Sequence, residues 1–150
     1  MLPLNRILCP VDFSDFSYSA LEAAAELGVH FYAELFVVHV VAPVPIVSAP
    51  AGQMSFNVPL YQEELKTSSQ QALEEVIEKS VPAGVKAHPM VAMGEPATEI
   101  VRLADEHEVD LIVISSHGMT GWRHLIFGSV AEKIIRHTAK PILSIPAPRD

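Results

Sequence analysis

The chain has 150 residues, of which 49% are apolar and 19% charged, as in a globular domain rather than a disordered chain. A net charge of −8 argues against nucleic acid as a partner, because nucleic-acid backbones are bound mainly through basic patches. The apolar runs are far shorter than the roughly 20 residues of a membrane helix, and the amino terminus lacks the order of a signal peptide. We therefore expect one cytoplasmic domain over residues 1–150, with no membrane contact.

The amino-terminal part of the chain alternates apolar strands with a helix. Residues 6–11 have the composition of a short buried strand, and helical spacing predicts a helix over 16–27 with Gly28 just past its end. The apolar, β-branched run 35–41 is typical of a strand covered on both faces, as in parallel sheets. His39 in this run is expected to be a core histidine with a satisfied ring, since no partner histidine lies at ligand spacing.

The single cysteine, Cys9, lies in the first predicted strand. One cysteine allows no internal disulfide, which agrees with a reducing compartment. A buried, inert thiol is the expected state.

The middle of the chain begins with a proline-rich stretch, 42–59, which predicts a long surface loop. Such a loop could cover a ligand or could simply be mobile. Residues 60–80 have the pattern of an amphipathic helix, and 84–93 alternate loosely, as in a strand near a sheet edge where Pro89 is acceptable.

Two further helices and two strands are predicted in the carboxyl-terminal part. Pro96 stands at the first position of a helix, and the apolar run 110–114 predicts the next strand. A helix over 130–137, with Ile134 and Ile135 inward, and a last strand over 141–146 complete the chain. Alternating strands and helices indicate the α/β class: a single doubly wound, Rossmann-like sheet of five parallel strands with helices on both faces.

The stretch 114–130 joins the fourth strand to the last helix. It contains Gly118, Gly121 and Gly128, and glycine lets the backbone approach a ligand closely. Ser129 and Glu132 have the spacing of a helix capping box. Backbone N–H groups and a helix N-terminus of this kind suit phosphate, although ordinary turn glycines would give the same pattern.

Charge is uneven along the chain. Between Ser115 and Lys140 four basic residues face one acidic residue, so this segment carries +3 and the rest of the chain −11. The excess of basic residues favours a small anionic ligand at the stretch 114–130, and a solvated basic helix face is the alternative.

The spacing Ser115-x-x-Gly118, nine residues, then Gly128-Ser129 resembles the signature G-x-x-G-(nine residues)-G-[S/T] of the ATP-binding branch of the universal stress protein family. The similarity extends over segments 7–12, 37–40, 94–96 and 140–143. Ser115 replaces the first glycine of the signature. Its side chain would narrow the pocket, or its hydroxyl would donate to a phosphate oxygen.

The resemblance implies the strand order 3-2-1-4-5 and a cleft at the carboxyl ends of the first and fourth strands. It implies ATP or a related adenine nucleotide there, with Mg²⁺ as its companion because few lysines are at hand. Asp12 would accept from ribose or adenine groups, or would serve only as a cap or turn former, and the backbone of Val40 would contact the adenine edge. The implied nucleotide-binding residues are Pro10, Val11, Asp12, Val40, Ile114, Ser115, His117, Gly118, Arg123, Gly128, Ser129 and Val130.

No catalytic or metal-ligating residue is predicted. The chain has no G-x-x-x-x-G-K-[S/T] loop and no G-x-S-x-G elbow. His117 is expected to contact phosphate or support the loop rather than act as a base, and Arg123 either screens phosphate charge or is solvated. A regulatory nucleotide-binding module is thus the leading interpretation; a stress-linked interaction protein that binds no nucleotide, and a slow ATPase, are the alternatives.

The last predicted strand carries the apolar run 142–145. The family resemblance implies a homodimer through this strand, and an uncovered apolar edge invites such pairing. A helix that covers the edge is the alternative. A further protein partner is expected, but its nature is unknown.

Overall fold

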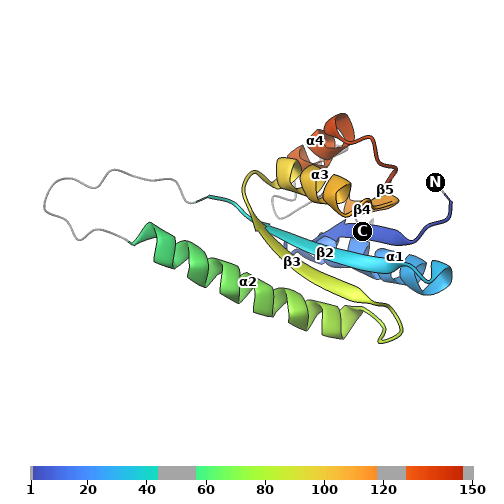
Figure 1. The fold of residues 1–150 in the computed structure, drawn as a ribbon, viewed down its shortest axis with the longest axis horizontal. Helices are drawn as coiled ribbons and strands as arrows, with labels where there is room; N and C mark the ends of the chain where they lie inside the picture. Colours follow the sequence, from blue (N-terminus) through green and yellow to red (C-terminus); the bar gives the residue numbers. More distant parts are fainter. Residues whose placement is uncertain (1, 44–56, 118–127, 147–150) are drawn as a thin grey trace, which may run out of the picture.

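The computed structural model describes residues 2–43, 57–117 and 128–146, and within these ranges five parallel strands form one sheet between layers of helices (Figure 1). The elements, in chain order, are β1 (Arg6–Pro10), α1 (Asp15–Phe31), β2 (Glu34–Val41), α2 (Val58–Ser80), β3 (Ala87–Met93), α3 (Pro96–Glu106), β4 (Leu111–Ser115), α4 (Ser129–His137) and β5 (Ile142–Ile145). The predicted α/β class and alternating order are confirmed.

The strands lie in the order β3-β2-β1-β4-β5, as predicted. The chain winds outward from β1 to β2 and β3 on one side, then crosses back to β4 and β5 on the other. The direction of winding therefore changes between β1 and β4. In doubly wound sheets ligands bind beyond the carboxyl ends of the strands at such a switch point.

Each face of the sheet has its own apolar core. Helices α1 and α2 cover one face and α3 and α4 the other (Figure 1). Alternate residues of one strand enter different cores, so Ile7 packs toward α1 and Leu8 toward α3, and both are fully buried. This agrees with the continuous apolar runs in the sequence, because a strand covered on both faces needs no polar side.

Helix α1 is longer than predicted. It continues through Gly28 to Phe31, and Tyr32 takes the left-handed conformation at its end with φ 57°. The prediction that Gly28 ends the helix was therefore wrong. A Cβ at Gly28 would lie 3.0 Å from Cγ1 of Val85, so this glycine allows the helix to pack closely against the turn before β3.

Helix α4 buries one of the two isoleucines that were predicted to face inward. Ile134 is 1% exposed, but Ile135 is 41% exposed, so the prediction for Ile135 was wrong. Ala131 and Ile134 share the inner side of the helix because they are three residues apart, and Ile135 is turned about 100° away from Ile134.

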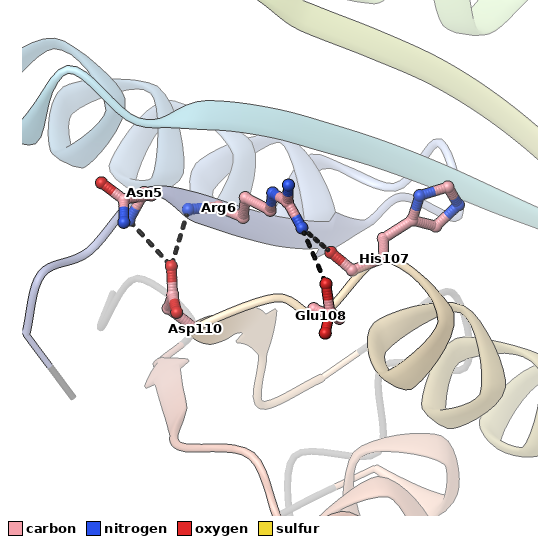
Figure 2. A network of polar contacts seen from close by, with 5 residues as sticks. All are labelled: Asn5, Arg6, His107, Glu108 and Asp110. Carbon is pink, nitrogen blue, oxygen red and sulfur yellow. Dashed lines mark hydrogen bonds and ion pairs between the residues drawn. The ribbon is translucent and has the colours of Figure 1, made fainter.

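Polar contacts fix the start of β1 at the amino end of the sheet (Figure 2). The carboxylate of Asp110 accepts from the backbone N–H groups of Asn5 and Arg6 at 2.8 and 2.9 Å. The guanidinium of Arg6 donates to the carbonyl of His107 at 3.0 Å. These bonds tie β1 to the turn between α3 and β4. They so align β1 with β4, and the carboxyl ends of these two strands form the switch point.

Candidate functional site

A cavity of about 260 Å³ lies at the carboxyl ends of the central strands. Ten of the twelve predicted nucleotide-binding residues line it: Pro10, Val11, Asp12, Val40, Ile114, Ser115, His117, Gly128, Ser129 and Val130. Gly118 and Arg123 lie outside the described residues. The structure thus brings together segments of the chain that are more than 100 residues apart.

The inner wall of the cavity is apolar. It is built by Val38 and Ile114 from the sheet, Pro96 and Ile100 from α3, and Ile134 from α4. The α3 residues were absent from the predicted site, because only the packing of α3 against the sheet brings them there. An apolar wall with polar groups at one side suits a ligand that has a flat ring and a charged end.

The amino end of α4 supplies the polar side. Gly128 is the N-cap residue and has no side chain with which to cap the helix, and Ser129 is the first helical residue. The predicted capping box of Ser129 and Glu132 was therefore wrong: the helix starts one residue earlier than the box requires, and Glu132 pairs with Arg136 at 2.7 Å instead. N–H groups in a first helical turn lack partners within the helix, and the helix dipole makes this end positive.

The end of β4 is held by a compact set of hydrogen bonds. Ser115 belongs to the strand, not to the loop as predicted, and its hydroxyl donates to the carbonyl of His117 at 2.5 Å. Ser116 is 6% exposed; its N–H donates to the carbonyl of Ile145 at 2.9 Å and its hydroxyl contacts Nδ1 of His117 at 2.8 Å. The carbonyl of Ser116 accepts from the N–H of Gly128 at 2.6 Å. Ser116 therefore joins β4, β5 and the start of α4, a role that the sequence did not indicate.

Asp12 shapes the turn between β1 and α1. Its Oδ1 accepts from the N–H of Ser14 at 3.0 Å and from the hydroxyl of Ser14 at 2.5 Å. Ser14 in turn caps α1 by accepting from the N–H of Ser17 at 3.2 Å. The turn-forming role considered for Asp12 is thus present, and the residue also lines the cavity. Phe13, the next residue, has φ 64°, which is rare outside glycine.

The ring of His39 has a hydrogen-bond partner, as predicted, but the residue is half-buried and lines the cavity, so the prediction of a core position was wrong. Its Nδ1 lies 2.7 Å from the carbonyl oxygen of Val11, and its ring lies against that of Phe13 with centroids 4.4 Å apart. A carbonyl can only accept, so Nδ1 carries the hydrogen.

Glu95 connects the two helices that flank the cavity. Its carboxylate caps α3 by accepting from the N–H of Thr98 at 2.8 Å, and it lies 3.2 Å from Nζ of Lys133 on α4. Hydrogen bonds from the hydroxyl and the N–H of Thr98, followed by the lysine, lower the pKa of Glu95 to about 2. The carboxylate is therefore charged over the physiological range and holds α3 beside α4.

In the ranges that the structure describes, no three side chains of the types that ligate metals converge. None of the helices in these ranges combines the length and the hydropathy needed to cross a bilayer.

Comparison with known proteins gives consistent matches along the chain. The model of the Universal stress protein family matches residues 3–146. Universal stress protein MJ0531 of Methanocaldococcus jannaschii is 37% identical over 145 residues, which cover 97% of this chain and 84% of the relative.

Two solved structures are similar in fold. The structure of hypothetical protein MJ0577 has a TM-score of 0.82 at 23% identity, and the match covers 98% of this chain and 99% of the MJ0577 chain. The universal stress protein from Archaeoglobus fulgidus in complex with dAMP has a TM-score of 0.60 at 25% identity and covers 96% of this chain and 98% of its own. From the family match and the identity to MJ0531, this chain belongs to the universal stress protein family.

Proposed function

We propose that this chain is a regulatory module of a stress response, formed by a single domain over residues 1–150, that binds an adenine nucleotide in the cavity at the carboxyl ends of β1 and β4. ATP accompanied by Mg²⁺ is the proposed ligand. The observation that carries the proposal is the amino end of α4, which lines the cavity and whose N-cap residue, Gly128, offers no side-chain cap. The A. fulgidus relative in complex with dAMP supports the adenine class.

The cavity offers a separate place for each part of such a ligand. The phosphates would meet the N–H groups of Ser129 and Val130 and the positive end of α4. The base would lie on the apolar wall beside the backbone of Val40, with Asp12 as an acceptor for ligand hydroxyl or amine groups. Neither lysine nor arginine occurs among the described residues that line the cavity, so Mg²⁺ would offset the charge of a triphosphate.

The first test uses protein purified without added nucleotide. The protein is denatured, and the small molecules released are identified by chromatography and mass. An adenine nucleotide near one per chain is the expected result. If none is released, calorimetric titration with Mg·ATP decides, and folded protein that binds no adenine nucleotide would refute the proposal.

Ser129→Pro tests the phosphate end of the site. Proline is tolerated at the first position of a helix, and Gly128 already has the extended conformation that precedes proline (φ −67°, ψ 159°). The substitution removes one N–H and one hydroxyl without breaking α4. We expect ATP affinity to fall about tenfold or more, the usual cost of a hydrogen bond to a charged group. Ser129→Ala removes only the hydroxyl. The difference in ATP affinity between the two variants, measured by the same titration, therefore gives the contribution of the N–H group.

An interaction protein that binds no nucleotide is the second candidate, and Ser115 is the observation that favours it. Its side chain occupies a position where the signature has none, and its hydroxyl holds the carbonyl of His117. Under this alternative Ser115→Gly would bind ATP and the natural chain would not. Under our proposal both bind, and Ser115→Gly changes affinity only in degree.

We propose further that the chain forms a homodimer through β5 and is cytoplasmic. A protein partner of unknown nature would sense whether nucleotide is bound. Leu143 on β5 is 38% exposed, which supports an apolar contact at this edge. The single buried cysteine suits a reducing compartment.

A further inference from the structure

The carbonyl of Val11 lies where β1 leaves the sheet. The N–H of Val11 donates to the carbonyl of Val38 at 2.7 Å, which continues the ladder between β1 and β2 by one residue. In a regular parallel ladder the carbonyl of Val11 would next accept from the N–H of Val40, two positions beyond Val38.

The side chain of His39 takes this carbonyl instead. The protonated Nδ1 of His39 donates to it at 2.7 Å, and the ring of Phe13 supports the imidazole. Across the ranges that the structure describes, no backbone hydrogen bond joins Val11 to Val40 through this carbonyl.

The main-chain groups of Val40 therefore point toward the cavity. Residues two apart in a strand direct their N–H and carbonyl groups to the same neighbour, so Val40 points as Val38 does, to the side of β1. The strand β1 ends at Pro10, and both Val11 and Val40 line the cavity there.

We propose that His39 is a positioning residue for the ligand: by holding the carbonyl of Val11, it keeps the N–H of Val40 available to an acceptor on the edge of the base. The inference rests on the proposed function and identifies the side chain that leaves this donor open. Protonation of His39 at Nε2 leaves the Nδ1 donor in place, so the arrangement does not depend on the charge of the ring.

Amide hydrogen exchange of Val40, followed by NMR on nucleotide-free protein, tests the arrangement without any ligand. His39→Phe keeps a ring against Phe13 but removes the donor, and His39→Leu removes both. Without the imidazole donor, the carbonyl of Val11 should pair with the N–H of Val40, its partner in a regular parallel ladder. In both variants we therefore expect exchange at Val40 to slow by about tenfold or more. His39→Asn is the matched control, because its amide nitrogen stands two bonds from Cβ, as Nδ1 does, and exchange should stay fast.

Calorimetric titration with Mg·ATP then links the arrangement to binding. We expect His39→Phe to weaken affinity by about tenfold, the usual cost of one hydrogen bond, and His39→Asn to retain most of it. Slow exchange at Val40 in the natural protein, or exchange and affinity unchanged in His39→Phe, would overturn the inference while leaving the proposed function standing. A natural protein that binds no adenine nucleotide would overturn the proposed function, and the role of His39 with it.

Discussion

Glu95 shows how a single residue can serve both a helix and the wall of a cavity. It caps α3 and pairs with Lys133 of α4, so its loss affects two elements at once. The side chain is 45% exposed, and solvent weakens its ion pair. The cap should therefore contribute more to stability than the pair does.

Glu95→Ala should lower the free energy of unfolding by roughly 1 kcal/mol at neutral pH, the ordinary value of a helix cap. The pKa of Glu95 in the folded chain, about 2, is below its ordinary value of 4.5, so the carboxylate stabilises the fold fully above that ordinary value. The difference between the two proteins should shrink as the pH falls from 4.5 towards 2. Urea denaturation across this range checks the prediction, with Glu75→Ala on the exposed side of α2 as the control; a difference that does not vary with pH would contradict it.

Individual site residues could be predicted from the sequence only where a motif or the main chain determines them. The family resemblance named twelve residues, and the ten of them that lie in the described ranges line the cavity. The role of Ser116 could not be predicted, because it depends on contacts with Ile145 and Gly128, which are distant along the chain. The predicted capping box at Ser129 was wrong for a related reason. The local sequence is compatible with a helix whose N-cap is Ser129 and with one whose N-cap is Gly128, and it does not decide between them.

At the scale of elements, the fit between α1 and the turn before β3 depends on Gly28. Glycine in a helix interior is about 1 kcal/mol less favourable than alanine, so an unhindered Gly28→Ala would be stabilising. Here the new Cβ would lie 3.0 Å from Cγ1 of Val85, which is 7% exposed and has little room to move.

Gly28→Ala should therefore be neutral or destabilising in the natural chain. In a Val85→Ala background the obstructing methyl is absent, and the same change should stabilise the fold by about 1 kcal/mol. Urea denaturation of the four proteins closes this double-mutant cycle. Equal effects of Gly28→Ala in both backgrounds would mean that the close contact does not determine the choice of glycine.

Elements were predicted better than their boundaries. The periodicity of apolar residues predicts a helix over 16–27, but the last turn to Phe31 depends on packing against Val85 and on a left-handed Tyr32. Ile134 and Ile135 are equally apolar, and only the position of the sheet decides which of them is buried.

At the scale of the whole molecule, β5 is one outer strand of the sheet and β3 the other. Pro89 lacks a backbone N–H and so interrupts the row of hydrogen-bond donors along β3, whereas β5 has no proline between Ile142 and Ile145. This difference favours β5 as the edge at which two copies would meet.

Ser144→Pro tests the proposed dimer. The N–H of Ser116 donates to Ile145, so the odd residues of β5 face β4 and the N–H of Ser144 points outward. Proline at this position should remove a bond between copies and leave the β4–β5 ladder intact. Light scattering should show a dimer for the natural chain and for Ser144→Ala, and a monomer for Ser144→Pro. A natural chain of monomer mass would refute the dimer.

The overall architecture could be predicted from the alternation of strands and helices, because right-handed crossovers leave few arrangements for five parallel strands. The strand order itself came from the family resemblance. The depth of the cavity wall depends on how α3 packs, and local sequence does not determine this.

The position of Cys9 gives this protein a practical property. The thiol is fully buried in the central strand, and burial raises its pKa to about 12. Maleimides and similar reagents react with thiolates, so the native cysteine should not react with them in the folded chain. A second cysteine introduced at an exposed position, such as Gln71→Cys on α2, can thus carry a single fluorophore without any other change to the sequence. Conformational change on ligand binding can then be followed by the spectrum of one dye.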